Sequence, residues 1–147
     1  MTDQAQELCL LYDMRRREVV EVAQRFDEAL EEDRRVNADM FDITRTTFSQ
    51  NQHPNATMRA LEADLEKADL PFLHLLIALC EIGMEVSQRL CSPSDKAEFA
   101  DMAGERFDQL SQSDLPAVVL AHTLTEIKAE HALTRLVTAI RMMELPC

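Results

Sequence analysis

The chain has 147 residues, and its 15 basic and 27 acidic residues give a formal net charge of −12. That charge repels nucleic-acid backbones and anionic membrane surfaces, so the partner we expect is a basic or amphipathic protein rather than a nucleic acid or a membrane. Hydrophobic residues make up 46% of the chain, well above the level of disordered acidic proteins, and good helix formers outnumber β-branched residues. The composition predicts an all-α fold: a compact helical bundle of about five to six helices, in a single domain over 1–147.

The first residues, MTDQAQEL, have neither the basic nor the apolar region of a signal peptide. The longest apolar run, Phe72 to Cys80, is far shorter than the ~20 residues that a membrane helix needs. These two observations favour a cytoplasmic protein, in which thiols normally stay reduced. The four cysteines, which form no CxxC pair, are therefore predicted to be buried or idle: Cys9, Cys80, Cys91 and Cys147.

Residues 4–48 carry a heptad pattern whose a and d positions are apolar except at Arg15, Asp33 and Thr47. A straight helix of ~45 residues at ~1.5 Å each would overhang a bundle of this size. The region is therefore either a helical hairpin, broken in the charged stretch 31–35, or a long kinked helix whose overhang a second chain covers. We favour the break.

The same stripe is longer than one small bundle obviously covers, and an uncovered apolar stripe promotes association between chains. We therefore predict a homodimer. The residues predicted to carry self-association are Tyr12, Val19, Val22, Phe26, Val36 and Met40.

A polar loop at 49–55 divides the chain, because SQNQHPN contains a proline and has no periodicity. Met58, Leu61 and Leu65 then predict a short amphipathic helix. Pro71 opens a longer helix to about Leu90, which is apolar nearly all round and therefore belongs at the centre of the bundle.

Two further helix starts follow. Ser92 is predicted to cap a helix, with Pro93 in its first position and Asp95 completing a capping box. Pro116 is predicted to open a last, unbroken helix to about Leu145, whose apolar residues lie on different faces at its two ends.

The segment Asp69-Leu70-Pro71 recurs 45 positions later as Asp114-Leu115-Pro116. In both copies the same spacing of leucines and a Glu-Ile-x-x-Glu sequence follow. This similarity predicts an internal repeat of two related helix-turn-helix units, 56–91 and 92–145.

The most distinctive predicted surface is a row of carboxylates on one stripe of the helix that follows Ser92. We name this row the acidic stripe: Asp95, Glu98, Asp101, Glu105 and Asp108. It is either a solvated face or a docking surface that steers a basic partner towards the protein. The second reading predicts a non-enzymatic acidic protein-binding module, which would act as an adaptor, a small chaperone, or an inhibitor or neutraliser of a basic protein.

The alternative is a carboxylate enzyme that uses a divalent metal. Its metal ligands would come from the polar strips of two helices: Glu81, Glu85, His122, Glu126 and Glu130. Di-metal bundles need Glu-x-x-His, which the sequence lacks, as it lacks HExxH and paired-cysteine zinc patterns. The sequence therefore predicts no cofactor and no catalytic residue.

Pairs of carboxylates three residues apart, such as Glu18 and Glu21, could also hold Mg²⁺ on one helical face. In this respect the chain loosely resembles the all-α nucleoside-triphosphate pyrophosphohydrolases. No cluster of basic residues that would bind the phosphates accompanies the pairs.

Overall fold

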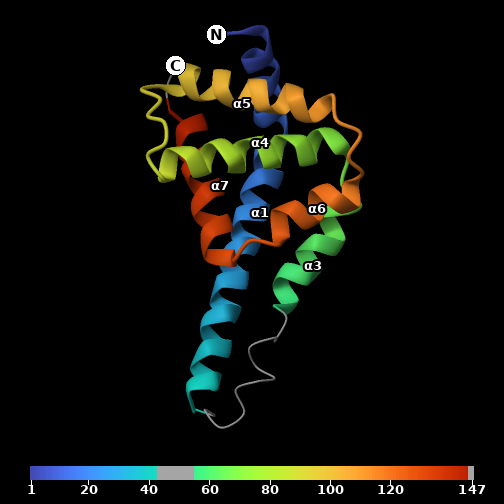
Figure 1. Ribbon diagram of the computed structural model, residues 1–147, viewed down its shortest axis with the longest axis vertical. Coiled ribbons are helices and arrows are strands. Elements are labelled where there is room, and N and C mark those ends of the chain that lie inside the picture. The colour runs from blue at the N-terminus through green and yellow to red at the C-terminus, as the bar shows by residue number, and fades with distance from the viewer. Residues whose placement is uncertain (43–54, 146–147) are drawn as a thin grey trace.

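The computed structural model describes residues 1–42 and 55–145, with side chains at 1–35 and 55–145. Over these residues the chain forms six helices and no strand (Figure 1), which confirms the predicted all-α bundle. The helices are α1 (Asp3–Asp42), α3 (Ala56–Leu65), α4 (Leu70–Ser87), α5 (Lys96–Ser111), α6 (Ala117–Thr125) and α7 (Ala129–Met143).

Helix α1 is continuous over its 40 residues, so the predicted break at 31–35 is wrong. The charged stretch stays helical because its side chains have partners. Glu31 pairs with Arg34 at 2.7 Å, and Asp33 accepts a hydrogen bond of 2.6 Å from the Asn55 amide at the start of α3. The helix is about 60 Å long at ~1.5 Å per residue, and its C-terminal part extends beyond α4, α5, α6 and α7 (Figure 1). The side chains of Val36 and Met40, and residues 49–54 of the predicted loop, lie outside the described residues.

The heptad positions of α1 form one wall of the core, as their spacing predicts. Seven of them are buried: Ala5, Leu8, Tyr12, Val19, Val22, Phe26 and Ala29. Two described positions of the stripe are polar, Arg15 and Asp33. Arg15 contacts Asp69 at the start of α4, and Asp33 contacts Asn55 at the start of α3. The polar interruptions of the stripe thus join α1 to the second half of the chain.

Helix α4 occupies the centre of the bundle, between α5, α6 and α7 (Figure 1), and every residue from Phe72 to Cys80 is buried. By length and composition alone α4 could cross a membrane, but 61% of it is buried against the other helices, as in the core helix of a bundle. It begins as predicted, because Asp69 accepts a hydrogen bond of 3.3 Å from the Phe72 backbone N–H and Pro71 lies in the first turn.

The cap of helix α5 lies three residues beyond Ser92, the cap that the sequence predicts. Its N-cap is Asp95, which accepts a hydrogen bond of 2.9 Å from the Glu98 backbone N–H. The Glu98 carboxylate reaches back and accepts a bond of 3.0 Å from the Ser94 backbone N–H. The two bonds form a variant of the capping box, in which the Glu98 side chain bonds the residue before the cap, and they satisfy two backbone donors at the start of α5.

The predicted last helix is wrong in its continuity, because the chain forms α6 and α7 with a break at 126–128. Leu120 and Leu124 of α6 are buried where that helix packs on α3 and α4. Leu136 and Ala139 of α7 are buried where α7 packs on α4 and α1. The break lets two apolar faces with different directions reach different neighbours.

Both glycines of the chain lie at close helix crossings. A Cβ at Gly83 of α4 would lie 2.1 Å from the carbonyl oxygen of Arg135 in α7. A Cβ at Gly104 of α5 would lie 2.8 Å from the backbone nitrogen of Ala5 in α1. These two contacts fix α4 against α7 and α5 against α1.

The first predicted unit contains α3 and α4, and the second contains α5, α6 and α7. The two units contact each other, because α3 packs on α6 and α4 packs on α5. A twofold relation between units 56–91 and 92–145 would exchange these two contacts. The split into α6 and α7 has no counterpart in α4, and the repeat stays a prediction.

Candidate functional site

The acidic stripe lies on α5, and four of its five carboxylates accept hydrogen bonds within the chain. Asp95 and Glu98 form the capping box, and Asp101 accepts a bond of 3.0 Å from the backbone N–H of Thr2. Asp108 accepts one of 2.9 Å from the Gln112 side chain. The stripe therefore also stabilises the start of α5 and holds the N-terminus of the chain.

No member of the acidic stripe forms an ion pair with a basic side chain in the part of the chain that the structure describes. Other carboxylates do so repeatedly, on arginines of α1 and α5: Arg15, Arg16, Arg25, Arg34 and Arg106. The carboxylates of the stripe thus pair with no basic side chain, on a helix that is held against α1 at Gly104.

The five residues of the alternative metal site do not converge. Glu81, Glu85 and Glu126 line one cavity between α4 and the end of α6, whereas His122 contacts Glu62 of α3 and Glu130 is exposed outside that cavity. Glu81 is held by an ion pair with Arg106. Over residues 1–42 and 55–145 no three His, Cys, Asp or Glu side chains are placed to hold a metal ion.

The same cavity brings together charged residues that the sequence did not associate. It has a volume of about 390 Å³, and α4, α5, α6 and α7 all contribute to its lining. Arg106 and Arg135 are its cations, beside the three glutamates. Arg106 and Arg135 belong to different helices, so only the tertiary structure shows that they share a wall.

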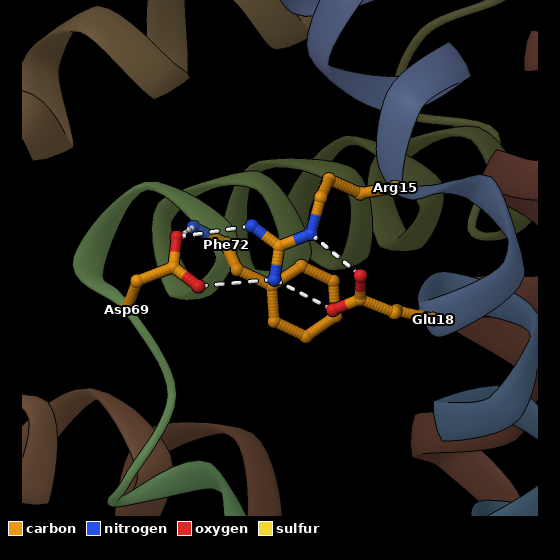
Figure 2. Close-up of polar contacts among 4 residues, drawn as sticks. All are labelled: Arg15, Glu18, Asp69 and Phe72. Carbon is orange, nitrogen blue, oxygen red and sulfur yellow. Dashed lines mark hydrogen bonds and ion pairs between the residues drawn. The ribbon is translucent and has the colours of Figure 1, made fainter.

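A second charged cluster joins α1 to α4, around a residue that the sequence analysis noted only as a polar heptad position. The guanidinium of Arg15 donates two hydrogen bonds of 3.0 Å to Asp69 and bonds of 2.9 and 2.6 Å to Glu18 (Figure 2). It also lies over the ring of Phe72, 4.5 Å from the ring centroid. The hydrogen bonds from Arg15, together with its charge, lower the pKa of Asp69 below its ordinary value. Because all four groups are already paired, we interpret this cluster as structural.

The exposed imidazole of His122 connects α3 and α6. Its Nδ1 lies 2.9 Å from a Glu62 carboxylate oxygen, and its Nε2 lies 3.6 Å from Glu126. His74, which the sequence places in a polar strip with Glu81 and Glu85, is instead buried and packs edge-on against Phe107. Helical periodicity found the strip but did not show which of its members reach solvent.

The predicted self-association residues lie mostly in the core of the single chain. Tyr12, Val19, Val22 and Phe26 are buried against other helices of the same molecule, so they offer no exposed stripe to a second copy. The reason for assigning them to a dimer contact therefore does not hold. Exposed apolar side chains on α1 are found instead at Leu10 and Met14.

The described cysteines agree with the prediction of buried or idle thiols in part. Cys80 is buried, and burial raises its pKa to about 12, so the unreactive thiol form dominates. Cys9 and Cys91 are half-buried, and burial also raises the pKa of Cys91. Cys147 lies outside the described residues.

Comparison with protein-family models, with curated proteins and with solved structures finds no match for this chain.

Proposed function

We propose that the protein is a non-enzymatic acidic module that binds a basic partner protein through the acidic stripe of α5. The observation that carries this proposal is the stripe's uncompensated charge: elsewhere arginines neutralise carboxylates, but the stripe has no cation among the described residues. Asp95, Glu98 and Glu105 are exposed, and Asp101 and Asp108 are half-buried. A row of carboxylates that reaches solvent accelerates encounter with a basic surface and favours the correct orientation.

The position of α5 supports the same role. Its buried face, which includes Phe99 and Ala103, packs on α1 and α4. The close approach at Gly104 leaves no space between α5 and α1 at that point. A partner would therefore meet carboxylates held on a supported helix, and little ordering of the backbone would be needed on binding.

The experiment is affinity capture from the native cells, followed by binding kinetics of the captured partner at several salt concentrations. The test variant carries Glu98→Gln, Asp101→Asn and Glu105→Gln. The amides keep the acceptor oxygens that cap α5 and hold Thr2, so the fold should survive. We expect a slower association rate for this variant, and a wild-type rate that falls steeply with salt.

A matched control removes the same three charges from the exposed side of α1, as Glu21→Gln, Asp27→Asn and Glu28→Gln. If the control slows association as much as the test variant does, net charge alone is responsible and the stripe is not the site. If neither set changes binding, the proposal is wrong.

A further inference from the structure

The cavity between α4, α5, α6 and α7 has the size and lining of a small-molecule site. Its volume of about 390 Å³ lies within the range of roughly 300–1,000 Å³ that such sites occupy. Its apolar wall is formed by Ile77, Met84, Leu124 and Ile127. The wall can take a short aliphatic group out of water, which is favourable at about 0.8 kcal/mol per buried CH₂.

The charged groups of the lining are not all neutralised by one another. Arg106 and Glu81 form an ion pair, so these two are mutually satisfied. The side chains of Arg135 and Glu85 form no hydrogen bond or ion pair with the residues that the structure describes, although both line the cavity and both are only partly exposed. Glu126 lines it too and lies 3.6 Å from the exposed His122 ring.

The free cation and the free carboxylate reach the cavity from two helices that pack closely together, α7 and α4. The carbonyl of Arg135 lies against Gly83 of α4, and Glu85 follows two residues later on the same helix. The Arg135 charge is close enough to Cys80 to act on its pKa, opposing the larger effect of burial. Both side chains line the cavity, Arg135 from α7 and Glu85 from α4.

We propose that this cavity binds a small zwitterion with an aliphatic side chain, of the class of an apolar α-amino acid. Arg135 holds its carboxylate, Glu85 holds its ammonium group with Glu126 nearby, and the apolar wall holds its side chain. A purely anionic ligand would leave Glu85 unpaired, and a purely cationic one would leave Arg135 unpaired. A charge that is partly removed from water and has no partner is costly. The proposal is independent of the acidic stripe.

The test is a titration of ¹⁵N-labelled protein, followed by the shifts of its backbone amide signals in two-dimensional NMR. The probes are L-leucine, isopentylamine, which lacks the carboxylate, and 4-methylpentanoate, which lacks the ammonium group. We expect leucine to shift the amides of Thr123, Ile127 and Arg135. Each analogue should bind at least about tenfold more weakly, since a hydrogen bond to a charged group contributes roughly 1.5–3 kcal/mol.

Two variants assign the roles. Arg135→Gln should weaken leucine about tenfold and leave isopentylamine unchanged or tighter, whereas Glu85→Gln should weaken leucine and leave 4-methylpentanoate unchanged or tighter. Arg141→Gln and Glu130→Gln, at exposed positions of α7, remove the same charges outside the cavity and should bind leucine as the wild type does. Thermal unfolding of each variant checks that its fold is intact.

The proposal is overturned if leucine produces no shifts at millimolar concentration, or if both analogues bind as tightly as leucine. Leucine binding that Arg135→Gln does not change would also overturn it. None of these results bears on the acidic stripe, so the two proposals fail separately.

Discussion

Arg15 and Asp69 form a two-point ion pair that joins the middle of α1 to the first turn of α4 (Figure 2). Asp69 accepts both hydrogen bonds while it also caps α4. A single carboxylate thus fixes where α4 begins and where α1 lies relative to it.

Arg15→Lys should lower the free energy of unfolding by about 1 kcal/mol, because an ammonium cannot make the planar, two-point contacts of a guanidinium. The estimate is modest because Asp69 is half-exposed. Chemical denaturation measures the change, and a double-mutant cycle with Asp69→Asn isolates the pair, since asparagine also caps helices. Arg34→Lys, which alters only an exposed pair with Glu31, is the control. Equal losses in both variants would contradict a special role for Arg15.

The same pair makes a prediction about acid. The pKa of Asp69 is lower in the folded chain than its ordinary value of 3.8. Its contribution to stability is therefore present at neutral pH and lost as the pH falls below about 4, where the unfolded chain takes up the proton first. In the Asp69→Asn variant this part of the pH dependence of the free energy of unfolding should disappear. Chemical denaturation at several pH values between 5 and 2.5 measures it.

His74 should make the protein less stable as the pH falls below its ordinary pKa of 6.5. Burial lowers the pKa of this imidazole, and its Nε2 has no hydrogen-bond partner among the described residues. Between the two pKa values only the unfolded chain binds the proton, so the free energy of unfolding falls as the pH falls through this range, with a limiting slope of about 1.4 kcal/mol per pH unit. His74→Leu should remove that slope and be at least as stable at pH 7. His131→Gln, on an exposed position, should retain it; a slope that survives in His74→Leu would refute the assignment.

Gly83→Ala should destabilise the fold by about 1–3 kcal/mol, since the new methyl group would collide with the carbonyl oxygen of Arg135 and force α4 away from α7. The sign of this change in stability distinguishes a glycine at a close helix contact from one in an exposed helix. In an exposed helix the same substitution stabilises by about 1 kcal/mol. Thermal unfolding measures the change, and a stabilised Gly83→Ala would show that α4 and α7 lie further apart than described.

Arg89→Gly should stabilise the protein by about 0.5–1 kcal/mol. Arg89 follows the last turn of α4 with a φ of 60°, and the Leu90 backbone N–H donates a hydrogen bond of 2.8 Å to the Glu85 carbonyl, as at a helix end that favours glycine. Chemical denaturation is the measurement. Gln88→Gly, one residue earlier with a negative φ, should instead destabilise. A loss of stability in Arg89→Gly would contradict the described end of α4.

Much of the fold could be predicted from periodicity. The heptad of α1, the apolar helix after Asp69 and the short helix around Leu61 all have the buried faces that their spacing indicates. The ends of the helices were harder to predict, because several neighbouring residues can cap a helix and tertiary contacts decide which of them does. Asp95 caps α5 in place of Ser92 because it accepts from the Glu98 backbone N–H while the Glu98 carboxylate accepts from Ser94, and the charged stretch of α1 stayed helical because Asn55 reaches Asp33.

Of the candidate sites, the acidic stripe could be read from the sequence, since residues three and four apart on one helix must share a face. Three other features emerge only once the helices are packed: Arg15 pairs with Asp69, Tyr12 and Phe26 are covered by the same chain, and Arg135 and Glu85 line one cavity. The difference lies in the range of the interactions. A helix fixes the relative positions of its own residues, whereas contacts between helices depend on where the chain breaks, as at 126–128, and on where a missing Cβ allows two backbones to meet.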